Sequence, residues 1–170
     1  DVCSSDLAET GKTVAAIKVG GEPEGVNISP DGKHVYVTSE EDSTVHVIDV
    51  ARPRAIRTIP VGPRPRTTTF LPDGSRAYVP AENGGEIRVI DTAAGKQVGV
   101  IKLTGELQRP MGGVVSPDGK TLYMTTGRGK TVAIIDTATN AHVGSIEVGE
   151  RDRKSTRLNS SHTDISRMPS

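Results

Sequence analysis

The stretch SPDGK at Ser29–Lys33 returns as LPDGS at Leu71–Ser75 and again as SPDGK at Ser116–Lys120. The first two copies lie 42 residues apart and the last two 45. Proline fixes φ at the second position of a turn and glycine supplies a positive φ, so each copy predicts a tight turn between two strands. The same turn at a nearly constant spacing indicates a chain built from structural repeats.

Outward from these turns, other residues keep the same spacing. Each copy has one tyrosine and one Ile-Asp pair in the same place: Tyr36, Tyr78 and Tyr123, then Ile48-Asp49, Ile90-Asp91 and Ile135-Asp136. Apolar residues alternate with a period of 2, and Gly and Pro interrupt them regularly, which is typical of short strands. In the first copy the pattern predicts strands at Glu24–Ser29, His34–Thr38, Thr44–Asp49 and Ala55–Val61. In the second copy, Pro80 lacks an N–H donor, so the strand is expected to end there.

Four antiparallel strands in about 42 residues match one blade of a β-propeller. The predicted fold is all-β: a partial β-propeller with three four-stranded antiparallel blades plus the first strand of a fourth. The repeats divide an incomplete propeller at 8–151 into blades of about 13–53, 54–95 and 96–140, with the start of the next at 141–151. A β-sandwich is the alternative, but it would not predict identical turns at a fixed spacing. Because propellers typically have 4–8 blades, further blades of the same parent chain are expected as partners.

The two ends do not share this pattern. Asp1–Leu7 and Asp152–Arg157 read as translations of the two complementary strands of one sequencing adapter, as expected in metagenomic data. We therefore expect residues 1–7 to be an unstructured artefact and residues 152–170 a disordered one. The alternative for the tail is a genuine polar disordered segment.

Composition excludes several classes of protein. The 170 residues carry 21 Lys plus Arg against 21 Asp plus Glu, and a neutral balance argues against a nucleic-acid partner. No apolar run approaches the roughly 20 residues of a membrane helix, so no membrane span is expected. A single cysteine, which lies in the adapter-like segment, cannot form an internal disulfide.

Two segments resemble the YVTN-type β-propeller repeat: Tyr36–Ser39 followed by Thr44–Asp49, and SPDGKTLYMTT (Ser116–Thr126) followed by TVAIIDTATN (Thr131–Asn140). The resemblance implies a bacterial or archaeal protein that is exported, hence periplasmic or extracellular. Similar repeats occur in lactonase-like propellers, in haem-binding domains of nitrite reductases and in proteins of quinone-dependent oxidation. The resemblance therefore specifies the fold and leaves the function open.

In propellers, the loops between strands two and three and the loops between blades share one face, where ligands usually bind. Candidate ligand-binding residues on that face are Arg64, Arg66, Arg109, Glu22, Glu82, Asn83 and Arg128. A guanidinium suits carboxylate or phosphate, so an anionic small molecule or a protein is the expected partner. The alternative is that these are solvated loop charges, whose Glu–Arg pairs contribute little.

No nucleophile motif, phosphate-binding loop or metal-ligand spacing is present, and we expect no catalytic residue, no metal and no cofactor. The acidic run Glu40–Asp42 lacks the spaced pattern of a calcium loop. We therefore favour a non-catalytic binding or scaffolding propeller and leave an enzymatic role open. The alternatives are part of a lactonase-like or haem- or quinone-associated redox enzyme, and a repeat module of a surface protein.

Overall fold

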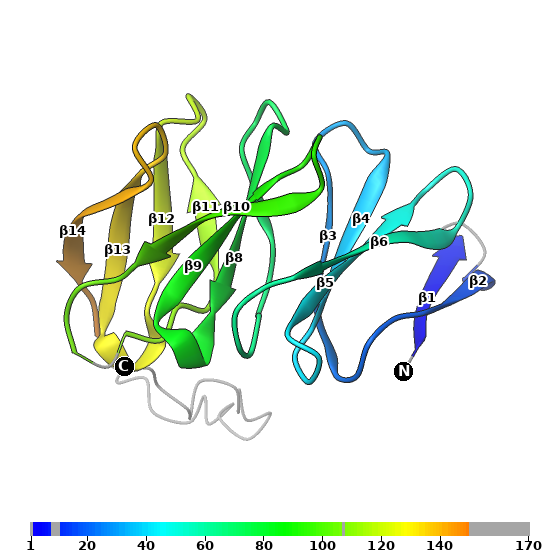
Figure 1. The fold of residues 1–170 in the computed structure, drawn as a ribbon, viewed down its shortest axis with the longest axis horizontal. Coiled ribbons are helices and arrows are strands. Elements are labelled where there is room, and N and C mark those ends of the chain that lie inside the picture. Colours follow the sequence, from blue (N-terminus) through cyan, green and yellow to red (C-terminus); the bar gives the residue numbers. More distant parts are fainter. Residues whose placement is uncertain (1, 8–10, 107, 150–170) are drawn as a thin grey trace, which may run out of the picture.

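The structure is a computed structural model that describes residues 2–7, 11–106 and 108–149. It contains three four-stranded antiparallel sheets, each formed by consecutive strands. The sheets stand side by side in a row, and one further strand pair lies at the outer end beside the first sheet (Figure 1). The predicted fold class, an all-β partial β-propeller, is confirmed.

The three sheets are the blades of this propeller, and their strands follow in chain order. Blade 1 consists of β3 (Pro23–Ile28), β4 (His34–Ser39), β5 (Thr44–Asp49) and β6 (Arg54–Pro60). Blade 2 consists of β7 (Thr69–Phe70), β8 (Arg76–Ala81), β9 (Glu86–Asp91) and β10 (Lys96–Lys102), with the 3-10 turn η1 (Glu82–Gly84). Blade 3 consists of β11 (Gly113–Val115), β12 (Thr121–Thr125), β13 (Thr131–Asp136) and β14 (Ala141–Glu147), with η2 (Gly127–Gly129).

The blade boundaries differ from the predicted ones by one strand. The four strands predicted for the first copy are those of blade 1. The predicted units 54–95 and 96–140, however, begin with β6 and β10, and each of these strands completes the preceding sheet. Likewise β14 is the outermost strand of blade 3 and does not begin a further blade at 141–151. A short turn joins each third strand to the fourth, so the two pair directly, whereas a longer loop then crosses to the next blade.

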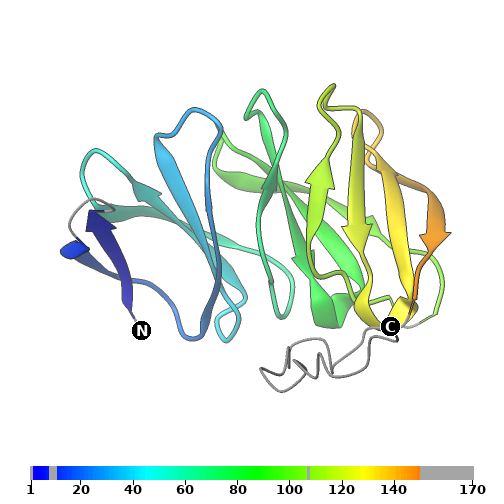
Figure 2. The same cartoon turned by 180° about the vertical axis from the view of Figure 1, so that it is seen from behind.

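The extra strand pair lies at the N-terminal side, next to blade 1 in both views (Figure 2). There β2 (Lys12–Lys18) pairs with β1 (Val2–Leu7), a segment that the sequence analysis expected to be unstructured. The residue pairing of β1 with β2 matches that of β5 with β6 at the equivalent positions. The register shift between Ser5 and Asp6 corresponds to the one between Val47 and Ile48. An unpaired edge of β2 would expose a row of N–H and C=O groups, and β1 satisfies them. Residues 152–170 lie outside the described part of the chain.

Strand β8 also differs from the prediction, because it continues through Pro80 to Ala81. The carbonyl of Pro80 accepts a hydrogen bond from the Arg66 N–H on the inner side of the blade. In an antiparallel sheet, the N–H and C=O of one residue point to the same neighbouring strand. The side of Pro80 that lacks an N–H therefore faces the loop that contains Arg66, and not β9. The pairing with β9 therefore survives the proline.

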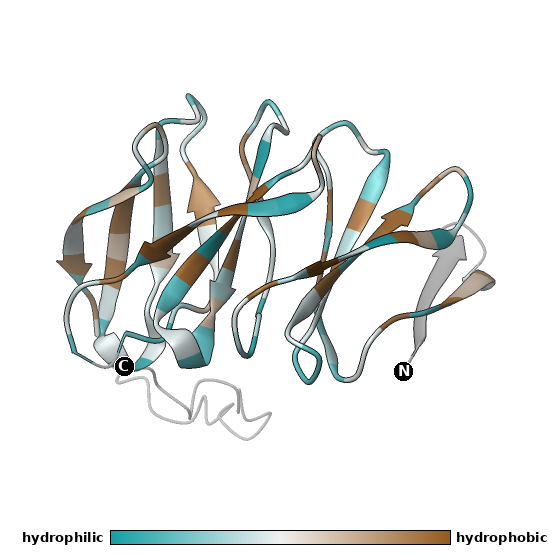
Figure 3. Ribbon diagram, in the orientation of Figure 1, coloured by the Kyte–Doolittle hydropathy of each residue, from teal (hydrophilic) through white to brown (hydrophobic). Residues whose placement is uncertain are grey.

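Apolar side chains gather between the sheets and not within each one. One cluster, which includes Tyr36, Val45 and Ile90, joins blades 1 and 2. A second, which includes Tyr78 and Leu122, joins blades 2 and 3. Figure 3 shows the apolar bands on the strands and the polar loops at the ends. Each blade boundary thus has its own core.

Candidate functional site

At one end of the propeller, the turn between strands two and three of each blade contacts the loop that leads into that blade. The Glu40 N–H donates to the carbonyl of Glu22 at 3.0 Å, and the Glu82 N–H donates to the carbonyl of Arg64 at the same distance. In blade 3 the Arg109 N–H donates to the carbonyl of Thr126. The structure thereby brings the predicted site residues to one surface, which we call the loop face.

The turns of the three blades share one backbone feature. Ser43, Gly85 and Lys130 hold equivalent positions, and all three have φ between 53° and 63°. A left-handed residue reverses the chain at the end of the turn and directs it into the third strand. The equivalence explains how three turns of different sequence present their side chains in the same way.

Arg66 is the centre of an ion-pair network that crosses from blade 1 to blade 2. Its Nη1 lies 2.7 Å from Oε1 of Glu24 and 3.0 Å from Oε2 of Glu40, both in blade 1. Its Nε donates to Oε2 of Glu82 at 2.6 Å, and its Nη2 also contacts that carboxylate. The Arg66 side chain is only 14% exposed, so these pairs are not the solvated loop charges of the alternative interpretation.

Glu82 also pairs with the other two arginines of the loop face, Arg64 and Arg109. Its side chain is 7% exposed, and it lies 3.4 Å from Nε of Arg64 and 3.4 Å from Nη1 of Arg109. Burial acts to raise the pKa of Glu82, but the hydrogen bond from Arg66 and the charges of Arg66, Arg64 and Arg109 outweigh it and hold that pKa below its usual value. Nε of Arg64 also lies 2.6 Å from Oε1 of Glu40. An anion that bound Arg66 would have to displace one of these carboxylates.

Two of the remaining predicted residues, Asn83 and Arg128, lie at exposed turn tips. Glu41, Asn83 and Arg128 occupy equivalent positions in the turns of blades 1, 2 and 3, and all are exposed. Their charge therefore runs from acidic through neutral to basic along the row of blades. Glu22, in the loop into blade 1, is exposed at the acidic end.

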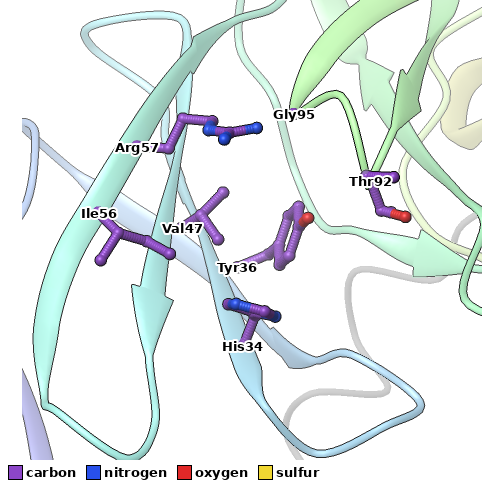
Figure 4. Close-up of a pocket in the computed structure, with 8 residues that line it drawn as sticks. His34, Tyr36, Val47, Ile56, Arg57, Thr92 and Gly95 are labelled. Carbon is purple, nitrogen blue, oxygen red and sulfur yellow. The ribbon is translucent and has the colours of Figure 1, made fainter.

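A cavity of about 210 Å³ lies between blades 1 and 2, on the side of the Pro-Asp-Gly turns, and the sequence did not predict it. Figure 4 shows Arg57 reaching toward Gly95, with Tyr36 and Thr92 on opposite walls. Burial raises the pKa of the Tyr36 hydroxyl, and the charge of Arg57 partly offsets this effect.

Between blades 2 and 3, two of the corresponding positions carry larger side chains, which make hydrogen bonds across the boundary. There the Tyr78 hydroxyl donates to Oδ1 of Asn140 at 3.2 Å, and Nη1 of Arg76 donates to the carbonyl of Thr137 at 3.1 Å. Gly95 and His34 stand at the positions of Asn140 and Arg76. The comparison of repeats could have indicated this cavity, because both replacements are smaller.

Among the described residues, no group of three or more His, Cys, Asp or Glu side chains is arranged to hold a metal ion. No helix in the described ranges is long and apolar enough to cross a membrane.

Known structures confirm the propeller fold. The chain is similar to a chain of Kuenenia stuttgartiensis hydrazine synthase, with a TM-score of 0.78 and 32% identity over 85% of this chain and 42% of that one. It is similar to the dihydro-heme d1 dehydrogenase NirN, with a TM-score of 0.71 and 14% identity over 86% of this chain and 33% of that one. The RRP9 WD40 repeats match with a TM-score of 0.67 and 16% identity over 79% of this chain and 41% of that one.

The last two similarities, at 14% and 16% identity, show the fold alone. The chain spans 42% or less of the length of each of these structures. A scan against protein-family models finds no match, and a search of curated proteins finds none. The structures that it matches include both WD40 repeats and a dihydro-heme d1 dehydrogenase.

Proposed function

We propose that this chain is part of a non-catalytic binding or scaffolding propeller of the YVTN type, and that a protein partner docks on its loop face. The observation that carries the proposal is the charge gradient at the turn tips, from Glu41 through Asn83 to Arg128, on top of a paired inner layer. A surface with one acidic and one basic end orients a partner of complementary polarity.

The inner layer supports this proposal because it is rigid and internally neutralised. Three carboxylates and three guanidiniums, those of Glu24, Glu40, Glu82, Arg64, Arg66 and Arg109, are engaged with one another across the blades. Groups committed in this way hold the loops in place, and the exposed tips above them are left for recognition. Residues that are fixed before binding lose little conformational entropy when the partner docks.

The test is a charge swap in the full-length parent protein. Glu41→Arg combined with Arg128→Glu keeps the net charge and reverses the gradient, while Lys33→Asp with Asp118→Lys makes a matching exchange on exposed residues of the Pro-Asp-Gly turns of blades 1 and 3, at the opposite end of the propeller. Proteins captured from an extract by the wild type are identified, and their affinities are then measured with purified components. We expect the first swap to weaken binding by about tenfold or more and the second to leave it unchanged. Equal effects of both swaps would contradict the proposal.

A second candidate is a redox-enzyme propeller, in which this chain forms part of a haem-associated protein. The observations in its favour are the 32% identity to the hydrazine synthase chain over 85% of this chain and the similarity in fold to the dihydro-heme d1 dehydrogenase NirN. The full-length parent protein, purified from its source or with haem supplied, would then show a haem absorption band. A colourless full-length protein with the charge-dependent binding described above would reject this candidate.

We also propose a periplasmic or extracellular location, which is supported by the resemblance of Ser116–Thr126 and Thr131–Asn140 to repeats of exported proteins. Fractionation of cells that express the tagged parent gene tests it. Recovery of the protein with the cytoplasmic fraction would contradict it.

A further inference from the structure

Equivalent apolar positions are buried at the inner blade boundaries and exposed on the outer face of blade 3. Tyr36 and Tyr78 are 3% and 0% exposed, whereas Tyr123 is 37% exposed. The isoleucine of the outermost strand follows the same rule: it is 7%, 1% and 2% exposed at Ile17, Ile59 and Ile101, but 50% exposed at Ile146. The side chains that join one blade to the next are therefore all present on blade 3, without a neighbour in the described chain.

At the boundary of blades 1 and 2, a polar side chain also reaches the following blade, whereas blade 2 has Pro80 at this position. Oγ1 of Thr38 donates to the carbonyl of Arg66 at 3.0 Å, across the boundary of blades 1 and 2. Blade 3 has a threonine, Thr125, at the same position, and it is exposed. Its backbone partner within the blade is retained, because Oγ1 of Thr125 bonds to Gly112 as Thr38 does to Gly25. Blade 3 thus presents the apolar and the polar parts of a blade boundary.

The charge at the rim of this boundary changes sign on blade 3. In blades 1 and 2 the turn carries Glu40 or Glu82, and the loop of the following blade supplies Arg64, Arg66 or Arg109. In blade 3 the corresponding position is Gly127, and the turn carries Arg128 and Lys130 instead. A following loop with arginines would meet like charges here, whereas an acidic loop would meet opposite ones.

We propose that the outer face of blade 3, formed by Val114, Tyr123, Thr125, Ile146 and Val148, is the docking surface for a fourth four-stranded blade whose leading loop is acidic. The loop into blade 1, Glu22-Pro23-Glu24, is an example of such a loop in this chain. The packing of this blade on blade 3 repeats that of the inner boundaries. This inference does not rest on the proposed function of the loop face.

The experiment continues the chain after Val148 with a second copy of one of its own repeats. Val148 holds the position of Val19 and Leu103 holds that of Val61, so residues 20–61 or 62–103 can follow in register. The first copy brings the acidic loop, and the second brings Arg64 and Arg66. Because the natural chain has no tryptophan, Tyr123→Trp places a single fluorescent reporter on the docking surface.

With the copy of 20–61, the tryptophan emission is expected to shift to shorter wavelength, its quenching by acrylamide to fall and the denaturation midpoint to rise. The copy of 62–103 is expected to give a smaller effect, and Arg128→Glu with Lys130→Glu should reverse this preference. Added salt should reduce the difference between the two copies. A reporter at Val26→Trp, on the opposite face and 56% exposed, serves as the control and should not change.

Two results would overturn the proposal, one for each part. If the reporter remains as exposed as in the unextended chain with both copies, no blade docks on this face. If both copies cover it equally and the charge reversal has no effect, the acidic preference is wrong.

Discussion

Replacement of Glu82 by glutamine removes one negative charge from the centre of the loop-face network and keeps the shape of the side chain. Arg66 then keeps its ion pairs with Glu24 and Glu40, but its short contacts with residue 82 in blade 2 no longer involve a charged group. Arg64 and Arg109 lose contacts of 3.4 Å each. The change therefore tests whether the buried pairs stabilise the junction of the blades.

The magnitude follows from these contacts. A hydrogen bond to a charged group contributes about 1.5–3 kcal/mol, and each longer contact with a partly exposed arginine about 0.2–1 kcal/mol. Glu82→Gln should therefore lower the free energy of unfolding by about 2–5 kcal/mol. The loss lies near the lower end of that for breaking a fully buried pair, because Arg66 retains two carboxylates.

The assay is urea denaturation followed by circular dichroism, with Glu41→Gln as the control. Glu41 is exposed at a turn tip of the same face, so its replacement should change the free energy of unfolding by less than about 0.5 kcal/mol. Since the pKa of Glu82 is lowered in the folded state, its contribution is complete above the unfolded value of about 4.3 and is lost as the pH falls through the folded value. The difference between wild type and Glu82→Gln should therefore be full at pH 7 and vanish in acid. Equal effects of the two glutamine variants at pH 7 would refute the reasoning.

Two further predictions concern His46 and the left-handed turn position. Nε2 of His46 accepts a hydrogen bond from the Gly20 N–H at 3.0 Å, and burial lowers the pKa of His46. The free energy of unfolding should therefore fall as the pH drops below about 6.5. His46→Ala should flatten this dependence, as measured by denaturation midpoints between about pH 7.5 and 5.5. Ser43→Gly relieves a φ of 55° and should stabilise the chain by about 1 kcal/mol. Gly85→Ser at the equivalent position should destabilise it by about 1–2 kcal/mol or more, because a Cβ there would lie 3.1 Å from the carbonyl oxygen of Gln108. Thermal melts of both turn variants check the signs, and two changes of the same sign would contradict the left-handed assignment.

The repeat of the Pro-Asp-Gly turns was sufficient to predict the blades, because each turn fixes a hairpin locally. The position of the sheet boundaries was not predictable in the same way. A period of 42 residues has no natural starting point, so β6 could be assigned to either neighbouring repeat until its pairing with β5 was known. The pairing of β1 with β2 is not encoded in an alternating apolar pattern, and it follows from the free edge of β2.

For the loop face, the sequence named residues that the structure brings to one surface, and it missed how they pair. Arg66 and Glu24 are 42 residues apart, at equivalent positions in consecutive copies, and the structure joins them at 2.7 Å. Opposite charges at equivalent positions of adjacent repeats are therefore a signal of contact across a blade boundary. His46 was missed because strand neighbours, and not its place in the repeat, provide its burial and its hydrogen bonds.

The location of the apolar clusters between the blades has an energetic consequence for any propeller that contains this segment. Nearest-neighbour contacts make stability a sum over blades and over boundaries. An open row has one boundary fewer than it has blades, whereas a closed ring has as many boundaries as blades. The blade that completes the ring therefore forms two boundaries at once and adds more free energy than any blade before it.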